Sequence, residues 1–235
     1  MFVADPVWLA DSFKNQLTDP DVGALDRNLI VADFLSALLP RMNLEDETVV
    51  DWGSGYGLLS RLMRDRGFNF MNFEEHVRPL FYAPSFDPGQ VRASMAVLSE
   101  VALHFDDPVG EFERLSRISS QILFTAVVPP SRIDENWWYL MPSTGQHVAF
   151  YSIDALRQLA ENLKVNLTTD GKFFHLLHRE PIPLPAKLMF SSRVLPFSLA
   201  RLGQLVRDVK RALGRSHSLL QLDQNTILLK SREDQ

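Results

Sequence analysis

A short glycine-rich segment follows an apolar stretch near residue 50. The segment 51–57 reads Asp-Trp-Gly-Ser-Gly-Tyr-Gly. Glycines let a strand turn tightly into a helix and let a ligand approach bare backbone, and the helix's first N–H groups then point at that ligand. The acid at Asp51 suits a ligand with a positive charge and suits a pyrophosphate poorly. The residues expected to contact such a ligand are Asp51, Trp52, Gly53, Ser54, Gly55 and Gly57.

Two further acids, Glu74 and Glu75, follow the next apolar stretch, 68–73. In a β-turn-α-β unit, a carboxylate at the end of the second strand can accept both hydroxyls of an adenosine ribose. S-adenosylmethionine combines an adenosine with the positive charges of an amino group and a sulfonium. The glycine spacing also differs from the dinucleotide fingerprint, in which two residues separate the last two glycines. The alternative is a structural turn with two solvated acids.

Helices and short strands must position these residues, and the apolar pattern alternates between the two. We expect helices over 26–39, 58–66, 108–118 and 153–163. We expect strands over 48–50, 68–73, 91–98, 122–128, 172–177 and 226–229. Pro40 is expected to end the first helix, and Asp107 and Ser152 to cap the third and fourth. The alternation favours a mainly parallel sheet that is covered by helices on both faces.

The segment 181–216 interrupts this alternation, because it begins proline-rich and continues as an amphipathic helix with basic residues. We interpret it as an insertion before the last strand that packs on the body of the protein. Contact with a membrane surface, an anionic substrate or a second subunit, which would give a homodimer, is the alternative. The chain is expected to be one domain: a helical segment over 1–45, a cofactor-binding core over 46–180, the insertion over 181–216, and the final strand and tail over 217–235.

Composition excludes several classes of function. The formal net charge of -5 argues against nucleic acid as a partner, because phosphate binding needs concentrated Lys and Arg. The chain has no cysteine, which excludes disulfides, a thiolate nucleophile and a Cys-ligated zinc site. No His and Asp cluster has the spacing of a metal site, so no metal is expected. The sequence shows neither a signal peptide nor a long apolar run, and we expect a soluble, cytoplasmic protein.

The acid and glycines at 51, 53, 55 and 57 match, position by position, motif I of the class I S-adenosylmethionine-dependent methyltransferases. This resemblance implies a Rossmann-like, mainly parallel sheet of seven strands with helices on both faces and an antiparallel last strand. It implies S-adenosylmethionine as cofactor and S-adenosylhomocysteine as product. It also implies that the glycine turn lies beneath the methionine part of the cofactor and that Glu74, or else Glu75, binds the ribose.

A second stretch, 98–108, is similar to the family's fourth-strand motif, Glu-Val-Leu-Glu-His followed by Asp-Pro. Leu103 stands where the motif has its second acid. The resemblance implies cofactor contacts for Ser99, Glu100 and His104. The segments 137–139 and 145–152, together with 21–28, are similar to a bacterial subgroup that acts on small molecules or sugars. The resemblance covers residues 8–178 and is specific for fold and cofactor, and weaker for substrate.

Methyl transfer to an oxygen requires alignment of the acceptor and removal of its proton. Histidine has the ordinary pKa that suits this role at neutral pH. We favour His147 as the base that removes the acceptor's proton, and the alternative is a histidine that only holds the loop in place. For His104 we favour a role in the cofactor pocket, and it is the second candidate for the base. Arg27 can pair with the methionine carboxylate, or else is a surface arginine. The aromatic residues at 137–139 can line an acceptor pocket or clamp the loop.

The leading hypothesis is therefore S-adenosylmethionine-dependent methyl transfer to a small-molecule or sugar acceptor, with oxygen as the favoured atom. The second hypothesis is a non-catalytic S-adenosylmethionine-binding partner protein in a biosynthetic complex, and Leu103 is the reason to keep it. The third is an NAD-dependent oxidoreductase, which Asp51 and the glycine spacing disfavour.

Overall fold

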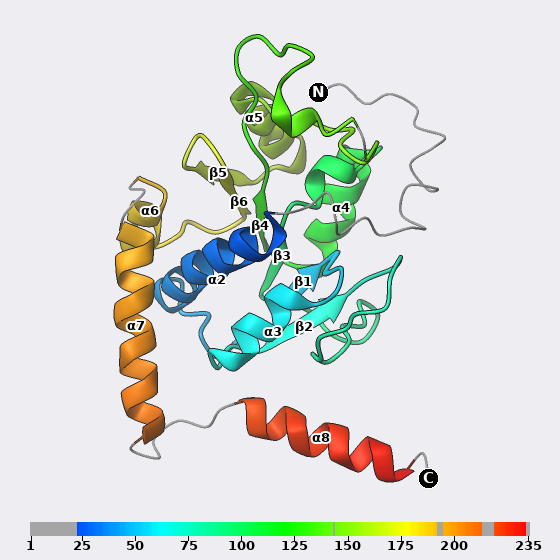
Figure 1. The fold of residues 1–235 in the computed structure, drawn as a ribbon. Coiled ribbons are helices and arrows are strands. Elements are labelled where there is room, and N and C mark those ends of the chain that lie inside the picture. Colours follow the sequence, from blue (N-terminus) through cyan, green and yellow to red (C-terminus); the bar gives the residue numbers. More distant parts are fainter. Residues whose placement is uncertain (1–22, 143, 192–194, 213–218, 234–235) are drawn as a thin grey trace.

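The fold is organised around one mixed sheet, in the computed structural model that describes residues 23–142, 144–191, 195–212 and 219–233 (Figure 1). Within these ranges the strands are β1 (Val49–Trp52), β2 (Phe70–Phe73), β3 (Met95–Leu98), β4 (Gln121–Thr125), β5 (Asn166–Thr169) and β6 (Phe174–His178). Their order is β2-β1-β3-β4-β6-β5. The first four run parallel, whereas β6 is antiparallel to both of its neighbours. This is a Rossmann-like α/β fold.

Helices cover both faces of the sheet. One face packs against α2 (Ala24–Arg41), α3 (Leu58–Asp65) and α6 (Leu184–Met189). The other face packs against α4 (Pro108–Ile118) and α5 (Ile153–Leu163). Successive residues of β1 serve the two layers, because Val49 belongs to the first core and Val50 to the second. A parallel strand between two helical layers must be apolar on both sides, which is why β1 and β3 are buried throughout.

Two of the predicted helix starts are confirmed by their caps. The Asp107 carboxylate accepts from the Gly110 N–H at 3.1 Å, and the Ser152 hydroxyl accepts from the Ala155 N–H at 3.2 Å. Each side chain satisfies a backbone donor that the first turn leaves without a helical partner. The prediction that Pro40 ends the first helix after residue 39 is wrong by two residues, because α2 runs through Pro40 to Arg41. Proline removes one N–H donor, and the last turn tolerates that loss.

The seventh strand is the main error of the sequence prediction. Residues 226–229 lie inside α8 (Leu219–Glu233), so the sheet of the described residues has six strands. The segment around them is rich in Leu, Gln and Lys, which favour helix and outweigh the short apolar run. One strand was missed: β5 pairs with β6 as an antiparallel edge. The antiparallel strand is therefore β6, between β4 and β5, and 181–216 is not an insertion before a strand.

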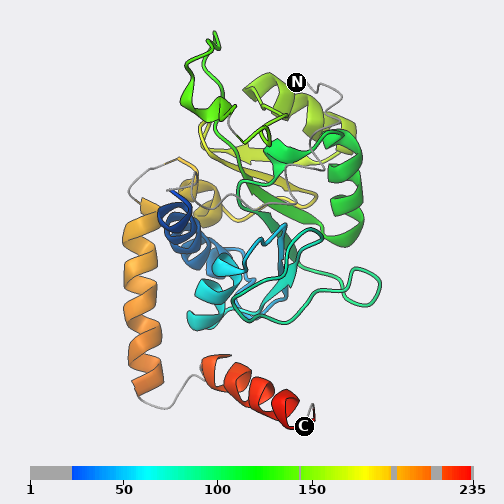
Figure 2. The same ribbon diagram turned by 45° about the vertical axis from the view of Figure 1, so that its right-hand side comes forward.

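The last two helices extend the molecule beyond the sheet (Figure 2). Helix α7 (Leu195–Ala212) packs along α2 and leaves Leu202, Leu205 and Val209 exposed. Helix α8 lies against α3 through one buried carboxylate, Asp223, which accepts from Arg64 Nε at 2.8 Å and from Arg61 at 2.9 Å. Within the described ranges, every helix is too short or too polar to span a bilayer. A homodimer through 181–216 stays a prediction.

Candidate active site

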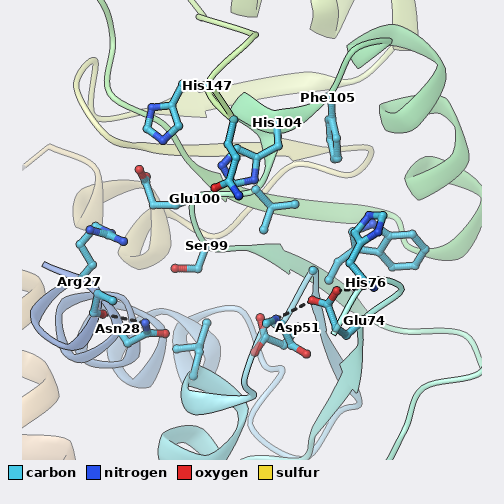
Figure 3. Close-up of a pocket in the computed structure, with 18 of the residues that line it drawn as sticks. Arg27, Asn28, Asp51, Glu74, His76, Ser99, Glu100, His104, Phe105 and His147 are labelled. Carbon is cyan, nitrogen blue, oxygen red and sulfur yellow. Dashed lines mark hydrogen bonds between the residues drawn. The ribbon is translucent and has the colours of Figure 1, made fainter. Parts of the chain in front are cut away.

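A cavity of about 750 Å³ opens along the carboxyl ends of β1, β3 and β4 (Figure 3). Segments distant in sequence meet there, because the carboxyl ends of parallel strands share one edge of a sheet. Most of the residues predicted from sequence line it: Arg27, Asp51, Trp52, Gly53, Ser54, Gly55, Glu74, Glu75, Ser99, Glu100, His104 and His147. Gly57 is the exception and lies behind the cavity wall.

The glycine turn folds back on the end of β2. The N–H groups of Gly53 and Ser54 both donate to the Phe73 carbonyl, at 2.9 and 3.1 Å. Gly53 has a φ of +69°, and a Cβ there would lie 2.8 Å from a methyl of Val101. Gly57 has a φ of +80° as N-cap of α3, and a Cβ there would lie 2.9 Å from the Phe81 carbonyl oxygen. Gly53 therefore shapes the cavity wall, whereas Gly57 sets the start of α3, whose first two residues line the cavity.

Asp51 is the buried acid of the cavity, with 2% of its surface exposed. Its Oδ2 accepts from the Ser60 N–H at 3.2 Å and from the Ser60 hydroxyl at 3.0 Å. Burial raises its pKa from 3.8 to about 7, although both bonds from Ser60 act in the opposite direction. The carboxylate therefore gains by approaching a positive charge, since a nearby cation favours its ionised form.

The affinity for S-adenosylhomocysteine, whose amino group is also cationic, is expected to rise with pH. The neutral Asp51 carboxyl prevails below pH 7 and attracts the ligand's ammonium less than the carboxylate does. Calorimetry should show a Kd about 10-fold tighter at pH 8 than at pH 6. The stability of the unliganded protein should change in the opposite direction. The pKa of Asp51 is higher in the folded protein than its ordinary value of 3.8, so the stability that its protonated form contributes is fully present below pH 4 and is lost as the pH rises through 7.

The control for this dependence is Asp51→Asn, which keeps the shape and cannot ionise. We expect it to bind more weakly and with a flat pH profile over the same range. A flat profile for the wild-type protein would contradict the role of Asp51.

The two acids after β2 take different positions. Glu74 Oε2 accepts from the Gly55 N–H at 2.7 Å, and its Oε1 accepts from the His76 N–H at 2.8 Å. Glu75 instead pairs with Arg114 at 3.2 Å on the surface, where the guanidinium of Arg114 lies 4.9 Å from the Trp52 ring. Glu74 thus fixes the glycine turn and borders the cavity, which makes it the better candidate for the ribose.

Glu100 lies in another half of the cavity from these acids. Figure 3 shows it on the side of Arg27 and His147, away from Asp51 and Glu74. Its backbone is left-handed, with a φ of +58°. Its N–H donates to the Thr125 hydroxyl at 2.8 Å, and that hydroxyl donates back to Glu100 Oε1 at 3.0 Å. A non-glycine residue keeps such a backbone only where its surroundings fix it, so this carboxylate is held in place.

His147 is oriented by a main-chain carbonyl. Its Nδ1 lies 2.6 Å from the carbonyl oxygen of Tyr139. A carbonyl only accepts, so Nδ1 carries the proton in the neutral ring and Nε2 carries the lone pair. The rings of His104 and His147 lie 5.6 Å apart, and both line the cavity. The geometry gives His147 the tautomer that a general base needs.

The sequence does not show that Tyr139 differs in position from its aromatic neighbours Trp137 and Trp138. The three side chains separate in the structure: Trp138 borders the cavity with 69% of its surface exposed, Tyr139 is buried, and Trp137 packs against Phe150. The Tyr139 hydroxyl donates to Glu100 Oε2 at 2.7 Å. No signal in the sequence pairs these two residues, because 39 positions separate them.

Residues 24–169 match the model of a family described as a methyltransferase domain. The chain belongs to this methyltransferase family. It is an S-adenosylmethionine-dependent methyltransferase, and the resemblance seen in its sequence is thereby confirmed. A comparison with curated protein sequences finds no match.

Solved structures of other methyltransferases share the fold. The mitomycin 7-O-methyltransferase MmcR is 16% identical with a TM-score of 0.51, and the alignment covers 76% of this methyltransferase and 62% of MmcR. The plantazolicin methyltransferase BpumL, solved in complex with S-adenosylhomocysteine, is 13% identical with a TM-score of 0.53. That alignment covers 83% of this methyltransferase and 89% of BpumL.

The residues of the cavity fit the cofactor of the methyltransferase family. A buried acid with a pKa near 7 suits the ammonium and sulfonium, and a bare-backbone turn lets the methionine part approach. Glu74 and the glycine turn lie together at the end of β2.

Proposed function

We propose that the protein methylates an oxygen of a small-molecule acceptor and that His147 Nε2 takes the acceptor's proton. The observation that carries the proposal is the 2.6 Å contact between His147 Nδ1 and the Tyr139 carbonyl oxygen. It leaves the lone pair on Nε2, which is the form that accepts a proton at neutral pH. When bound, the cofactor would supply an electrophilic methyl carbon and, in its sulfur, a neutral thioether as leaving group. His147 Nε2 would hold the proton that the acceptor oxygen gives up as it takes the methyl group.

Each half of the cavity has its own task in this proposal. On the cofactor side, Asp51 and the glycine turn hold the methionine part, and Glu74 holds the ribose. Ser99 lies between the two halves (Figure 3). On the acceptor side, His147 removes the proton, and Glu100 binds a donor group of the acceptor. Alignment of the two reacting atoms supplies much of the rate, because it turns a bimolecular step into one within a single complex.

A small acceptor fits the size and lining of the cavity. A volume of about 750 Å³ lies within the range of ligand pockets. The exposed ring of Trp138 beside polar groups supports a sugar or another ring-shaped molecule with hydroxyls. The net charge of -5 supports a partner other than nucleic acid. The chain's lack of cysteine supports a cytoplasmic location.

Calorimetry with S-adenosylhomocysteine and with NAD tests the cofactor side of this proposal. We expect saturable binding of S-adenosylhomocysteine and none of NAD, because the Asp51 carboxylate repels a pyrophosphate. A preference for NAD would remove the assignment of the glycine turn and favour an oxidoreductase.

Methyl-release assays with pools of hydroxyl-bearing small molecules and sugars test the acceptor side. Transfer to an alcohol or phenol supports the proposal. Tight cofactor binding without transfer to any pool would favour the non-catalytic partner protein instead.

A further inference from the structure

The chain between β4 and α5 is a long loop that lines the half of the cavity that contains His147. It leaves the sheet after the Val128 N–H, which donates to the Lys172 carbonyl at 2.8 Å. It returns where the N–H groups of Val148 and Ala149 both donate to the Leu103 carbonyl at 2.9 Å. Figure 1 shows this segment in green, rising away from the sheet. Its middle therefore needs anchors of its own if His147 is to keep a fixed position.

The phenol of Tyr139 is such an anchor, and its two hydrogen-bonding functions bind the segments that follow two neighbouring strands, β3 and β4. Its O–H donates to Glu100 Oε2 at 2.7 Å, and its oxygen accepts from the Val127 N–H at 3.1 Å. Burial and the adjacent Glu100 carboxylate raise the pKa of this phenol well above its usual value. Tyr139 therefore keeps its proton and is unsuited to act as the base.

The backbone of the same residue holds His147. The Tyr139 carbonyl lies in a short helical turn, η2 (Trp138–Leu140), closed by the Leu140 N–H, which donates to the Trp137 carbonyl at 3.0 Å. The carbonyl oxygen of Tyr139 faces His147 Nδ1, and the two rings lie 5.1 Å apart. Phenol and carbonyl belong to one buried residue in this short turn, so a hydrogen-bonded phenol restrains the backbone that carries the carbonyl.

We propose that Tyr139 is a positioning residue that couples Glu100 and His147. Its phenol sets the carboxylate that receives the acceptor's donor group, and through the same anchor its carbonyl sets the histidine tautomer. The proposal rests on the proposed function, in which His147 is the base. It adds that acceptor recognition and proton removal depend on one hydroxyl.

Tyr139→Phe, which deletes that hydroxyl and keeps the ring, tests the coupling. We expect kcat to fall roughly 30- to 100-fold, as for a displaced catalytic group. KM for the acceptor should rise, and Kd for S-adenosylhomocysteine should stay within about two-fold.

Tyr151→Phe is the matched control. Tyr151 is buried like Tyr139, and its hydroxyl donates to the Ala102 carbonyl at 2.6 Å, but it does not line the cavity. Both variants lose one buried hydroxyl and the hydrogen bond that it donates. We expect kcat and the acceptor KM of Tyr151→Phe to match those of the wild type. Equal kinetic effects in the two variants would overturn the proposal, since a general loss of packing would then explain both.

A readout without activity separates this proposal from the proposed function. Nitrogen-15 NMR of the imidazoles, with His147 assigned through His147→Gln, should show the Nδ1–H tautomer in the wild type and in Tyr151→Phe. Tyr139→Phe should show a mixture of tautomers. An Nε2–H tautomer in the wild type, or an unchanged signal in Tyr139→Phe, would overturn the positioning role. If the three proteins show the expected tautomers but the wild type transfers no methyl group to any acceptor, the proposed function is wrong and the positioning of His147 by Tyr139 still stands.

Discussion

His147→Ala is expected to lower kcat by about 100-fold or more while the Kd for S-adenosylhomocysteine stays within about two-fold. The imidazole lies in the half of the cavity away from Asp51 and Glu74, and its contact with the Tyr139 carbonyl places the lone pair on Nε2. Removing it therefore takes away proton transfer and spares cofactor binding. Single-turnover methyl transfer measures the first quantity, and calorimetry measures the second.

His147→Gln gives this prediction its control, because it keeps a polar side chain at the position and cannot take up the acceptor's proton. It should lose turnover to a similar extent and keep the Kd for S-adenosylhomocysteine. Undiminished turnover in the variant would show that another group, with His104 the first candidate, removes the proton or that no base is needed.

Asp223→Ala is expected to destabilise the protein by about 3–5 kcal/mol, because it leaves buried guanidinium charge without its partner. The side chains of Asp223 and Arg64 are only 4% and 3% exposed, and the two make a second contact at 2.5 Å. Burial alone would raise the pKa of Asp223, but the donors from Arg64 and Arg61 hold it below its usual value. This stabilisation is therefore present at neutral pH and is lost as the pH falls through the acid range.

An exposed ion pair supplies the comparison. Asp154 pairs with Arg157 at 2.8 Å, with 89% and 66% of the two side chains exposed. Asp154→Ala should change the free energy of unfolding by less than about 0.5 kcal/mol, because water and salt screen such a pair. Denaturant unfolding at pH 7 measures both variants. Similar values for the two would show that α8 does not dock on α3 through this carboxylate.

The sequence predicts best what local residues decide. The strand before Asp51, the turn at Gly53 and the caps at Asp107 and Ser152 all follow from side chains within a few positions, and the structure has each of them. The family motif adds the fold in which these elements are arranged around one sheet. Most of the cavity-lining residues could be named for the same reason.

What the sequence does not show is decided by contacts between distant segments. The helix propensity of the segment around 226–229 outweighs its apolar run, but nothing local shows that this helix binds α3 through Asp223. Tyr139 looks like one of several loop aromatics until its hydroxyl meets Glu100. Three of the four residues of the edge strand β5 are polar, so its apolar pattern is weak, and it forms because β6 offers it a partner.

The raised pKa of Asp51 has a consequence beyond affinity. In the proposed function, the carboxyl is half protonated near neutrality before the nucleoside arrives and becomes ionised once the ammonium lies beside it. Cofactor binding would then release a fraction of a proton into the solvent, and product release would take it up again. Cofactor exchange is thus a small proton cycle of its own, separate from the proton that the acceptor gives up, and the heat it exchanges depends on the buffer that receives it.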